Sequence, residues 1–190
     1  MGVRLGAHAL GFIFAPSPRR TSPEKVRKII DTLPPFVQTV GVFVDESLAT
    51  IREIKRFCGL DLVQLHGEES PEFCIELMPH AVKAFRLKDG RSVSHIKSYT
   101  GRVRAVLLDT HEKEKKGGTG KSFDWNLALK VKAMGLPLIL SGGLGPFNIR
   151  GAITTVRPYG VDVNSKIEHR PGKKDPVLMK ALMEAIKMIG

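Results

Sequence analysis

The sequence contains little cysteine, few aromatic residues and no long apolar run. Its 190 residues include two cysteines, Cys58 and Cys74, and neither lies in a Cys-x-x-Cys or Cys/His spacing that would hold zinc. No apolar segment approaches the ~20 residues that a membrane-spanning helix needs, and the first residues lack the succession of a signal peptide. These absences exclude a zinc finger and a membrane-spanning protein, and they predict a cytoplasmic protein with two buried thiols.

The chain has a formal net charge of +11, but aromatic residues make up only 6% of it. A charge of this size suggests nucleic-acid binding, but no RNA-recognition, zinc-finger or helix-turn-helix pattern accompanies it. The same charge equally supports the steering of a small anionic substrate. We therefore expect no nucleic-acid partner and keep a basic nucleic-acid protein as a third alternative. The basic residues are spread along expected helical faces and interleaved with acids, as at Lys25, Arg27, Lys28, Arg52, Lys55, Arg56, Lys130 and Lys132.

Short apolar or β-branched runs alternate with longer amphipathic stretches from one end of the chain to the other. This alternation is typical of repeated βα units around a parallel sheet. Since 42% of the residues are hydrophobic, the chain can form a sizeable core, and we expect one α/β domain over residues 1–190. The seven expected strands cover residues 9–14, 39–44, 62–66, 81–85, 105–109, 138–141 and 161–164.

The first seven residues look like the last turn of a helix that stops at Gly6. We expect one strand and most of one helix to precede them. Adding these elements gives eight βα units, so the predicted fold is a TIM (β/α)₈ barrel lacking its first strand and most of its first helix. The alternative is an open sheet of seven strands with a frayed end. The residues expected to cap helices are Ser22, Ser47, Ser70, Ser92 and Asp175.

Two loops after expected strands are candidates for phosphate binding. Active sites of barrels lie at the carboxyl ends of the strands, where segments 141–143 and 164–166 are found. Backbone N–H groups of both loops could form a phosphate cradle, because glycine permits close approach and helix N-termini favour anions. For Gly142 and Gly143 alone, a plain turn is an equally good interpretation.

Three titratable residues also stand at strand ends. Asp109 ends an apolar strand, and its surroundings could raise its pKa and make it a general acid. Asp162 lies in the last expected strand, where its charge needs either a substrate hydroxyl or a structural ion pair. His66 could contact substrate, although its position favours a hydrogen-bonded structural histidine. All three are candidate site residues.

A series of motifs in a fixed order resembles the phosphoribosylanthranilate isomerases. The resemblance covers essentially the whole chain, and the combination is far more specific than any one piece. It implies an Amadori rearrangement, in which N-(5-phosphoribosyl)anthranilate becomes 1-(2-carboxyphenylamino)-1-deoxyribulose 5-phosphate without a metal or organic cofactor. The motifs are residues 10–14, 17–19, 22–23, 40–44, 63–67, 108–110, 117–120, 123–125, 141–144, 161–163 and 171–175.

The resemblance also implies roles for individual residues. Asp109 matches the acid that protonates the ribose ring oxygen, and Arg19 matches the arginine that holds the anthranilate carboxylate. Asp162 matches the carboxylate near the sugar and the aniline nitrogen. The residues that match the phosphate-binding positions are Gly142, Gly143, Ser165 and the backbone of Lys166.

The departures from the family pattern concern catalysis. The family's general base is a cysteine at the end of a first strand, and no residue of this sequence matches it. Neither Cys58, which precedes an expected strand, nor Cys74, inside an expected outer helix, can substitute. Lys166 stands where many relatives have glycine, which permits binding through its backbone N–H if its φ is negative.

Two expectations follow for the chain as a whole. Without the base, the chain is expected to be impaired by about 10²- to 10⁴-fold in rate; the alternative is a non-catalytic barrel remnant that binds phosphate and aromatic acids. Missing one strand would leave two sheet edges open, and open edges favour pairing with a second chain. We therefore expect a small anionic phosphorylated ligand and a possible homodimer.

Overall fold

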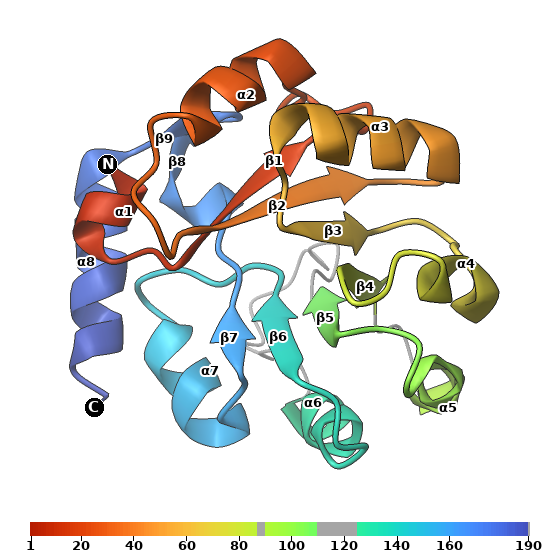
Figure 1. Ribbon diagram of the computed structural model, residues 1–190. Coiled ribbons are helices and arrows are strands. Elements are labelled where there is room, and N and C mark those ends of the chain that lie inside the picture. The colour runs from red at the N-terminus through yellow and green to blue at the C-terminus, as the bar shows by residue number, and fades with distance from the viewer. Residues whose placement is uncertain (87–89, 110–124, 190) are drawn as a thin grey trace.

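The computed structural model describes residues 1–86, 90–109 and 125–189, in which seven parallel strands form a curled sheet (Figure 1). Each strand pairs with the next along the chain, so the order in the sheet is the order in the sequence. This arrangement is the predicted set of seven βα units. The strands are β1 (Ala9–Ile13), β2 (Gln38–Phe43), β3 (Leu62–Leu65), β4 (Ala81–Arg86), β5 (Ala105–Asp109), β6 (Leu138–Ser141) and β7 (Gly160–Val161).

Helices connect the strands and cover the outer face of the sheet (Figure 1). After β7, the chain forms a short antiparallel hairpin of β8 (Glu168–Arg170) and β9 (Lys173–Lys174), which was not predicted. The helices are α1 (Gly2–Leu5), α2 (Pro23–Ile30), α3 (Leu48–Cys58), α4 (Pro71–Ile75), α5 (Gly90–Ile96), α6 (Trp125–Lys132), α7 (Ile149–Val156) and α8 (Pro176–Lys187), with 3₁₀ turns η1 (Lys97–Tyr99) and η2 (Ser165–Ile167).

Local sequence signals explain most helix ends. The side chains of Ser22, Ser47 and Ser70 each accept a hydrogen bond from the backbone N–H three residues later, as predicted for N-caps. Ser92 was wrongly predicted as a cap, because α5 already begins at Gly90. Gly6 ends α1 in the left-handed conformation, with φ of 106°, which confirms the predicted helix stop.

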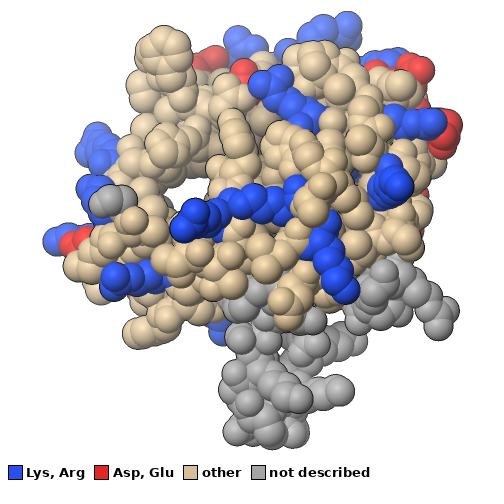
Figure 2. Space-filling view, turned by 90° about the horizontal axis from the view of Figure 1, so that it is seen from below, with Lys and Arg blue, Asp and Glu red and all other residues tan. Residues whose placement is uncertain are grey.

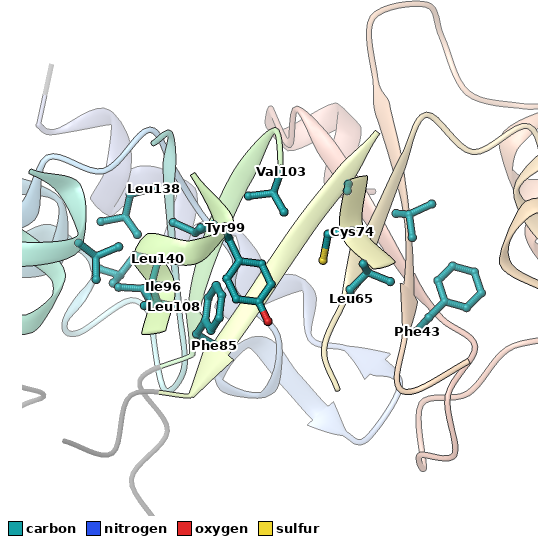
Figure 3. Close-up of a cluster of buried hydrophobic side chains, with 14 of the residues drawn as sticks. Phe43, Leu65, Cys74, Phe85, Ile96, Tyr99, Val103, Leu108, Leu138 and Leu140 are labelled. Atoms are coloured by element: carbon teal, nitrogen blue, oxygen red, sulfur yellow. The ribbon is translucent and has the colours of Figure 1, made fainter. Parts of the chain in front are cut away.

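The two faces of the sheet have different environments. Because successive strand residues point to opposite faces, one set packs against the helices in the main core. Figure 3 shows part of this core, which contains Phe43, Leu65 and Leu108 of the strands together with Ile96 and Tyr99. The other set forms a separate cluster that contains no helix residue and therefore marks the inner face: Leu62, Val82, Ala84, Ala105, Leu107 and Ile139.

The edges of the curled sheet are β1 and β7. Among the described strands, β1 pairs only with β2, and β7 pairs only with β6. The β8–β9 hairpin reaches from the end of β7 to the loop after β1, and a cavity of about 470 Å³ lies between residues 18–21 and 170–173. The hairpin therefore connects the two edges at the end of the sheet where all the strands finish. We call this end the carboxyl rim.

Lysine and arginine side chains do not gather into one patch on the face seen from below. Figure 2 shows lysine and arginine side chains scattered over this face among uncharged residues, with few acidic side chains between them. In the described ranges, none of the helices has both the length and the apolar character required to cross a bilayer.

Candidate active site

The carboxyl rim carries polar side chains on several neighbouring strands. Asp109 is the last residue of β5, and Ser141 is the last residue of β6 and its partner in the sheet register. Asp162 directly follows β7, and His66 directly follows β3. Because Leu107 belongs to the inner cluster, alternation places Asp109 on the same inner face. The sheet thus brings side chains from four strands to the same end of its inner surface.

His66 faces the carboxylate of Asp109. The distance from His66 Nε2 to Asp109 Oδ2 is 3.5 Å, and both side chains are 18% exposed. On the other side of the ring, Gln64 Nε2 lies 3.2 Å from His66 Nδ1. If the Gln64 amide donates to Nδ1, the neutral ring carries its proton on Nε2, which is directed at Asp109. This geometry orients His66 toward the predicted acid.

Asp162 has a hydrogen-bonding partner on the adjacent strand. Ser141 Oγ donates to Asp162 Oδ2 at 3.0 Å. Desolvation by the surrounding protein raises the pKa of Asp162. Part of the residue is nevertheless exposed to water. The hydrogen bond from Ser141 and the charge of Lys174 oppose that rise, whereas the charge of Asp109 adds to it. Asp162 and Asp109 are therefore close enough to influence each other electrostatically.

The two predicted halves of the phosphate cradle lie against each other. Gly142 and Gly143 adopt left-handed conformations, with φ of 85° and 64°, which favour glycine at these positions. The Asn148 side chain braces this loop by donating to Gly143 O at 3.0 Å and accepting from Gly145 N at 2.8 Å. A Cβ added to Gly145 would lie 2.7 Å from the Cβ of Lys166. Loop 142–145 therefore packs directly on turn η2.

The residues predicted on η2 adopt an ordinary right-handed conformation. Ser165 and Lys166 are both exposed and belong to a 3₁₀ turn, which L-amino acids adopt readily. The φ of Lys166 is negative, so the condition stated above for binding through its backbone N–H is met.

Arg19 lies in the loop after β1, where it contacts a protein carboxylate. Its guanidinium forms a bidentate ion pair with Glu168 of β8, with Nη2 at 2.6 Å from Oε2. Hydrogen bonding to Glu168 raises the pKa of Arg19, and burial opposes this effect. The guanidinium is therefore held at the carboxyl rim, at the opposite edge of the sheet from β7.

Neither cysteine reaches the carboxyl rim. Cys58 is the last residue of α3, and its Sγ lies 3.4 Å from the carbonyl oxygen of Pro23. Cys74 belongs to α4 and packs beside Leu65 in the core between sheet and helices (Figure 3). Burial raises the pKa of Cys74 to about 11, so this thiol stays protonated at neutral pH.

Sequence reasoning missed three charged residues of this region. Arg86 ends β4 directly beside Asp109 in the sheet register, and the rule that strand ends carry function could have identified it. Glu168 and Lys174 belong to the unpredicted hairpin, and no local pattern indicates their contacts with Arg19 and Asn164. Motif residues 110, 117–120, 123 and 124 lie outside the described residues. Within the described ranges, no group of three or more His, Cys, Asp or Glu residues is arranged to hold a metal ion.

Comparison with family models and with curated proteins gives the same family. The family model of N-(5'-phosphoribosyl)anthranilate (PRA) isomerase matches residues 2–185. The N-(5'-phosphoribosyl)anthranilate isomerase of Geobacter sulfurreducens is 47% identical over 188 residues, covering 98% of this chain and 91% of that protein.

Two solved structures share the fold. A phosphoribosylanthranilate isomerase in complex with reduced 1-(o-carboxyphenylamino)-1-deoxyribulose 5-phosphate has a TM-score of 0.86 at 40% identity, covering 98% of this chain and 91% of that chain. Monomers generated from the dimeric enzyme of Thermotoga maritima give a TM-score of 0.85 at 39% identity, with coverages of 98% and 91%. These similarities confirm the predicted barrel-type α/β fold. The chain belongs to the phosphoribosylanthranilate isomerase family.

Proposed function

We propose that the chain acts as a phosphoribosylanthranilate isomerase of tryptophan biosynthesis, converting N-(5-phosphoribosyl)anthranilate into 1-(2-carboxyphenylamino)-1-deoxyribulose 5-phosphate. The observation that carries the proposal is a continuous row of polar side chains along the carboxyl rim. It leads from His66 through Asp109 and Ser141 to Asp162. A phosphorylated sugar joined to an aromatic acid can be bound along such a row, with its two anionic ends held by cationic and N–H groups.

Each part of the row has a proposed role. Asp109 protonates the ribose ring oxygen and so opens the sugar, and His66 orients the Asp109 carboxylate. Asp162 accepts a hydrogen bond from the sugar or from the aniline nitrogen, and Arg19 binds the anthranilate carboxylate through paired N–H groups. The backbone N–H groups that receive the phosphate belong to Gly142, Gly143, Ser165 and Lys166.

The removal of the proton from sugar carbon 2 is assigned to none of the 190 residues. Both cysteines lie within helices, and the thiol of Cys74 is kept protonated by its raised pKa of about 11. The residues assigned here account for two steps of the conversion, substrate binding and ring opening. Neither step requires a metal ion or an organic cofactor.

Two measurements test the proposed function. Turnover is followed with freshly prepared N-(5-phosphoribosyl)anthranilate, and binding of the reduced product analogue is followed by calorimetry. We expect saturable binding of the analogue and product formation that is about 10²- to 10⁴-fold slower than with a positioned base. A chain that binds neither the substrate nor the analogue would contradict the proposal.

Gly145→Ala is expected to weaken the binding of phosphorylated ligands. The new Cβ would lie 2.7 Å from the Cβ of Lys166, and this atom is fixed to the backbone, so turn η2 must move. We expect affinity for the reduced product analogue to fall about tenfold, equivalent to about 1.4 kcal/mol. The matched control is Gly151→Ala in α7, where no outside heavy atom lies within 4 Å of the added Cβ. Equal affinities of the two variants would show that the contact with η2 is unimportant.

We also propose a homodimer and a cytoplasmic location. The described edge strands β1 and β7 each have one partner in the sheet, and such edges can pair with a second chain. The Thermotoga maritima relative is described as dimeric. Cys58 and Cys74 are both free thiols, which suits a reducing compartment. A monomeric mass in light scattering would contradict the dimer.

A further inference from the structure

Glu168 is a buried carboxylate with donors on three sides. Arg19 Nε donates to both oxygens, at 3.1 and 2.9 Å, and Arg19 Nη2 donates to Oε2 at 2.6 Å. Gly172 N and Lys174 Nζ donate to Oε1, at 3.1 and 3.2 Å. The Glu168 side chain is 3% exposed, whereas Arg19 is 25% exposed. The carboxylate is therefore enclosed, while the guanidinium still reaches solvent.

The electrostatics of this cluster keep Glu168 charged. Burial by itself raises the pKa of Glu168, but the hydrogen bonds from Arg19 and Lys174 outweigh burial and lower the pKa overall. A charge-assisted, bidentate pair of this kind has a defined geometry, because both groups are planar. Glu168 thus fixes the plane and the direction of the Arg19 guanidinium.

Glu168 occupies one side of the Arg19 guanidinium, and this determines which N–H groups of Arg19 can still bind a ligand. Glu168 is bound through Nε and Nη2, which is the side-on face of the guanidinium. The end-on face, formed by Nη1 and the second N–H of Nη2, is not used by Glu168. A second carboxylate can bind bidentately to this end-on face while the first stays in place. The ion pair therefore does not compete with the proposed anthranilate site.

The same cluster extends to the phosphate side of the rim. Lys174 Nζ, which contacts Glu168, also donates to the carbonyl oxygen of Asn164 at 3.1 Å and to its side-chain oxygen. Asn164 immediately precedes η2, the turn proposed to bind phosphate. One hairpin thus contacts Arg19 at the β1 edge and the η2 turn at the β7 edge.

We propose that Glu168 is a positioning residue, which aims the end-on face of Arg19 at the substrate carboxylate and, through Lys174, fixes its separation from the phosphate-binding turn. This inference rests on the proposed function and concerns how the two anionic ends of one ligand are recognised. Glu168 itself does not contact the substrate. It acts through Arg19, whose charge alone would attract a carboxylate without orienting it.

The test compares two ligands that differ by one group. Calorimetry measures the binding of the reduced product analogue, 1-(o-carboxyphenylamino)-1-deoxyribulose 5-phosphate in reduced form, and of the same molecule without its carboxylate. Glu168→Gln is expected to raise the Kd of the carboxylated analogue about tenfold or more and to change that of the carboxylate-free analogue less than about twofold. Glu76→Gln, which disturbs an exposed ion pair with Arg52, is the matched control and should change neither.

Further variants separate positioning from general structural damage. With Arg19→Met already present, Glu168→Gln should produce no additional loss for the carboxylated analogue, because the two residues act as one unit. If Glu168→Gln does not fold, Glu168→Asp provides the same comparison, since it keeps the charge and shortens the reach. Equal weakening of both analogues, or of neither, would overturn the positioning role. Failure of the unmodified chain to bind either analogue would instead contradict the proposed function itself, and this inference with it.

Discussion

Asp109→Asn is expected to lower the turnover number by about 10²- to 10⁴-fold, the range typical of a removed general acid. Asparagine has nearly the same shape, but its amide cannot deliver a proton to the ribose ring oxygen. Binding of the reduced product analogue should change less than about threefold, because Asp109 is assigned to ring opening rather than to holding either anionic end of the ligand. Steady-state kinetics and calorimetry on the same preparations separate the two effects.

The control for this prediction is Asp31→Asn. Asp31 forms an exposed ion pair with Arg27 at the end of α2, away from the carboxyl rim, so its replacement should leave turnover unchanged. His66→Asn should give an intermediate loss, since the Asp109 carboxylate stays while the ring that faces it at 3.5 Å is removed. If Asp109→Asn retained full turnover, Asp109 would not be the acid.

The strands with clear chemical boundaries could be predicted from the sequence to the residue. β5 and β6 are apolar runs that end at the first polar side chain, at Asp109 and Ser141. The last strand was predicted over 161–164, but β7 covers Gly160–Val161. The register pairs only these two residues with β6, although the backbone N–H of Asp162 still donates to Leu140 O at 2.8 Å. The change from apolar to polar residues therefore predicts the last residue of β5 and of β6, but it does not predict the last residue of β7.

The β8–β9 hairpin could not be predicted from its composition. Its strands are three and two residues long, mostly charged and exposed, so they show no alternation of apolar and polar positions. The turn between them contains Gly172 in the left-handed conformation, with φ of 81°. This signal indicates a turn but not what the hairpin contacts. Arg19 and Glu168 are 149 residues apart, and only the fold shows that they meet.

The candidate site was partly accessible to sequence reasoning because parallel strands all finish at one edge. That rule placed Asp109, Asp162 and His66 together without any coordinates. It gives no information on second partners, such as the Gln64 amide beside His66 or the Ser141 hydroxyl on Asp162. These contacts depend on side-chain direction and on strand register, which the sequence pattern does not specify.

A buried lysine in the mostly apolar strand β4 supports the carboxyl rim. Lys83 lies in the middle of β4 on the side that faces the helices, and its Nζ is 3.1 Å from Glu69 Oε2. The two side chains are only 3% and 2% exposed. Lys83 also donates to the carbonyl oxygen of Gly67 at 2.7 Å, and Glu69 accepts from the backbone N–H of Asp45 at 3.0 Å. The pair thus ties β4 to the loops that follow β2 and β3.

Lys83→Met is therefore expected to lower the free energy of unfolding by about 3–5 kcal/mol, the usual cost of leaving a buried charge without its partner. Methionine fills a similar volume but leaves Glu69 enclosed and unpaired. The measurement is urea unfolding of both variants under the same conditions. The exposed pair offers the control, because Arg52→Met should cost less than about 1 kcal/mol.

The double variant distinguishes loss of the ion pair from loss of packing. Lys83→Met combined with Glu69→Gln removes both charges, so it should be less destabilising than the sum of the two single variants by about 1–3 kcal/mol. Strict additivity would mean that each side chain acts through separate contacts. A cost below about 1 kcal/mol for Lys83→Met would mean that Glu69 is satisfied by the backbone N–H groups of Asp45 and Gly67 alone. In that case the loops around His66 would keep their positions without the lysine, and the ion pair would not be what holds the rim in place.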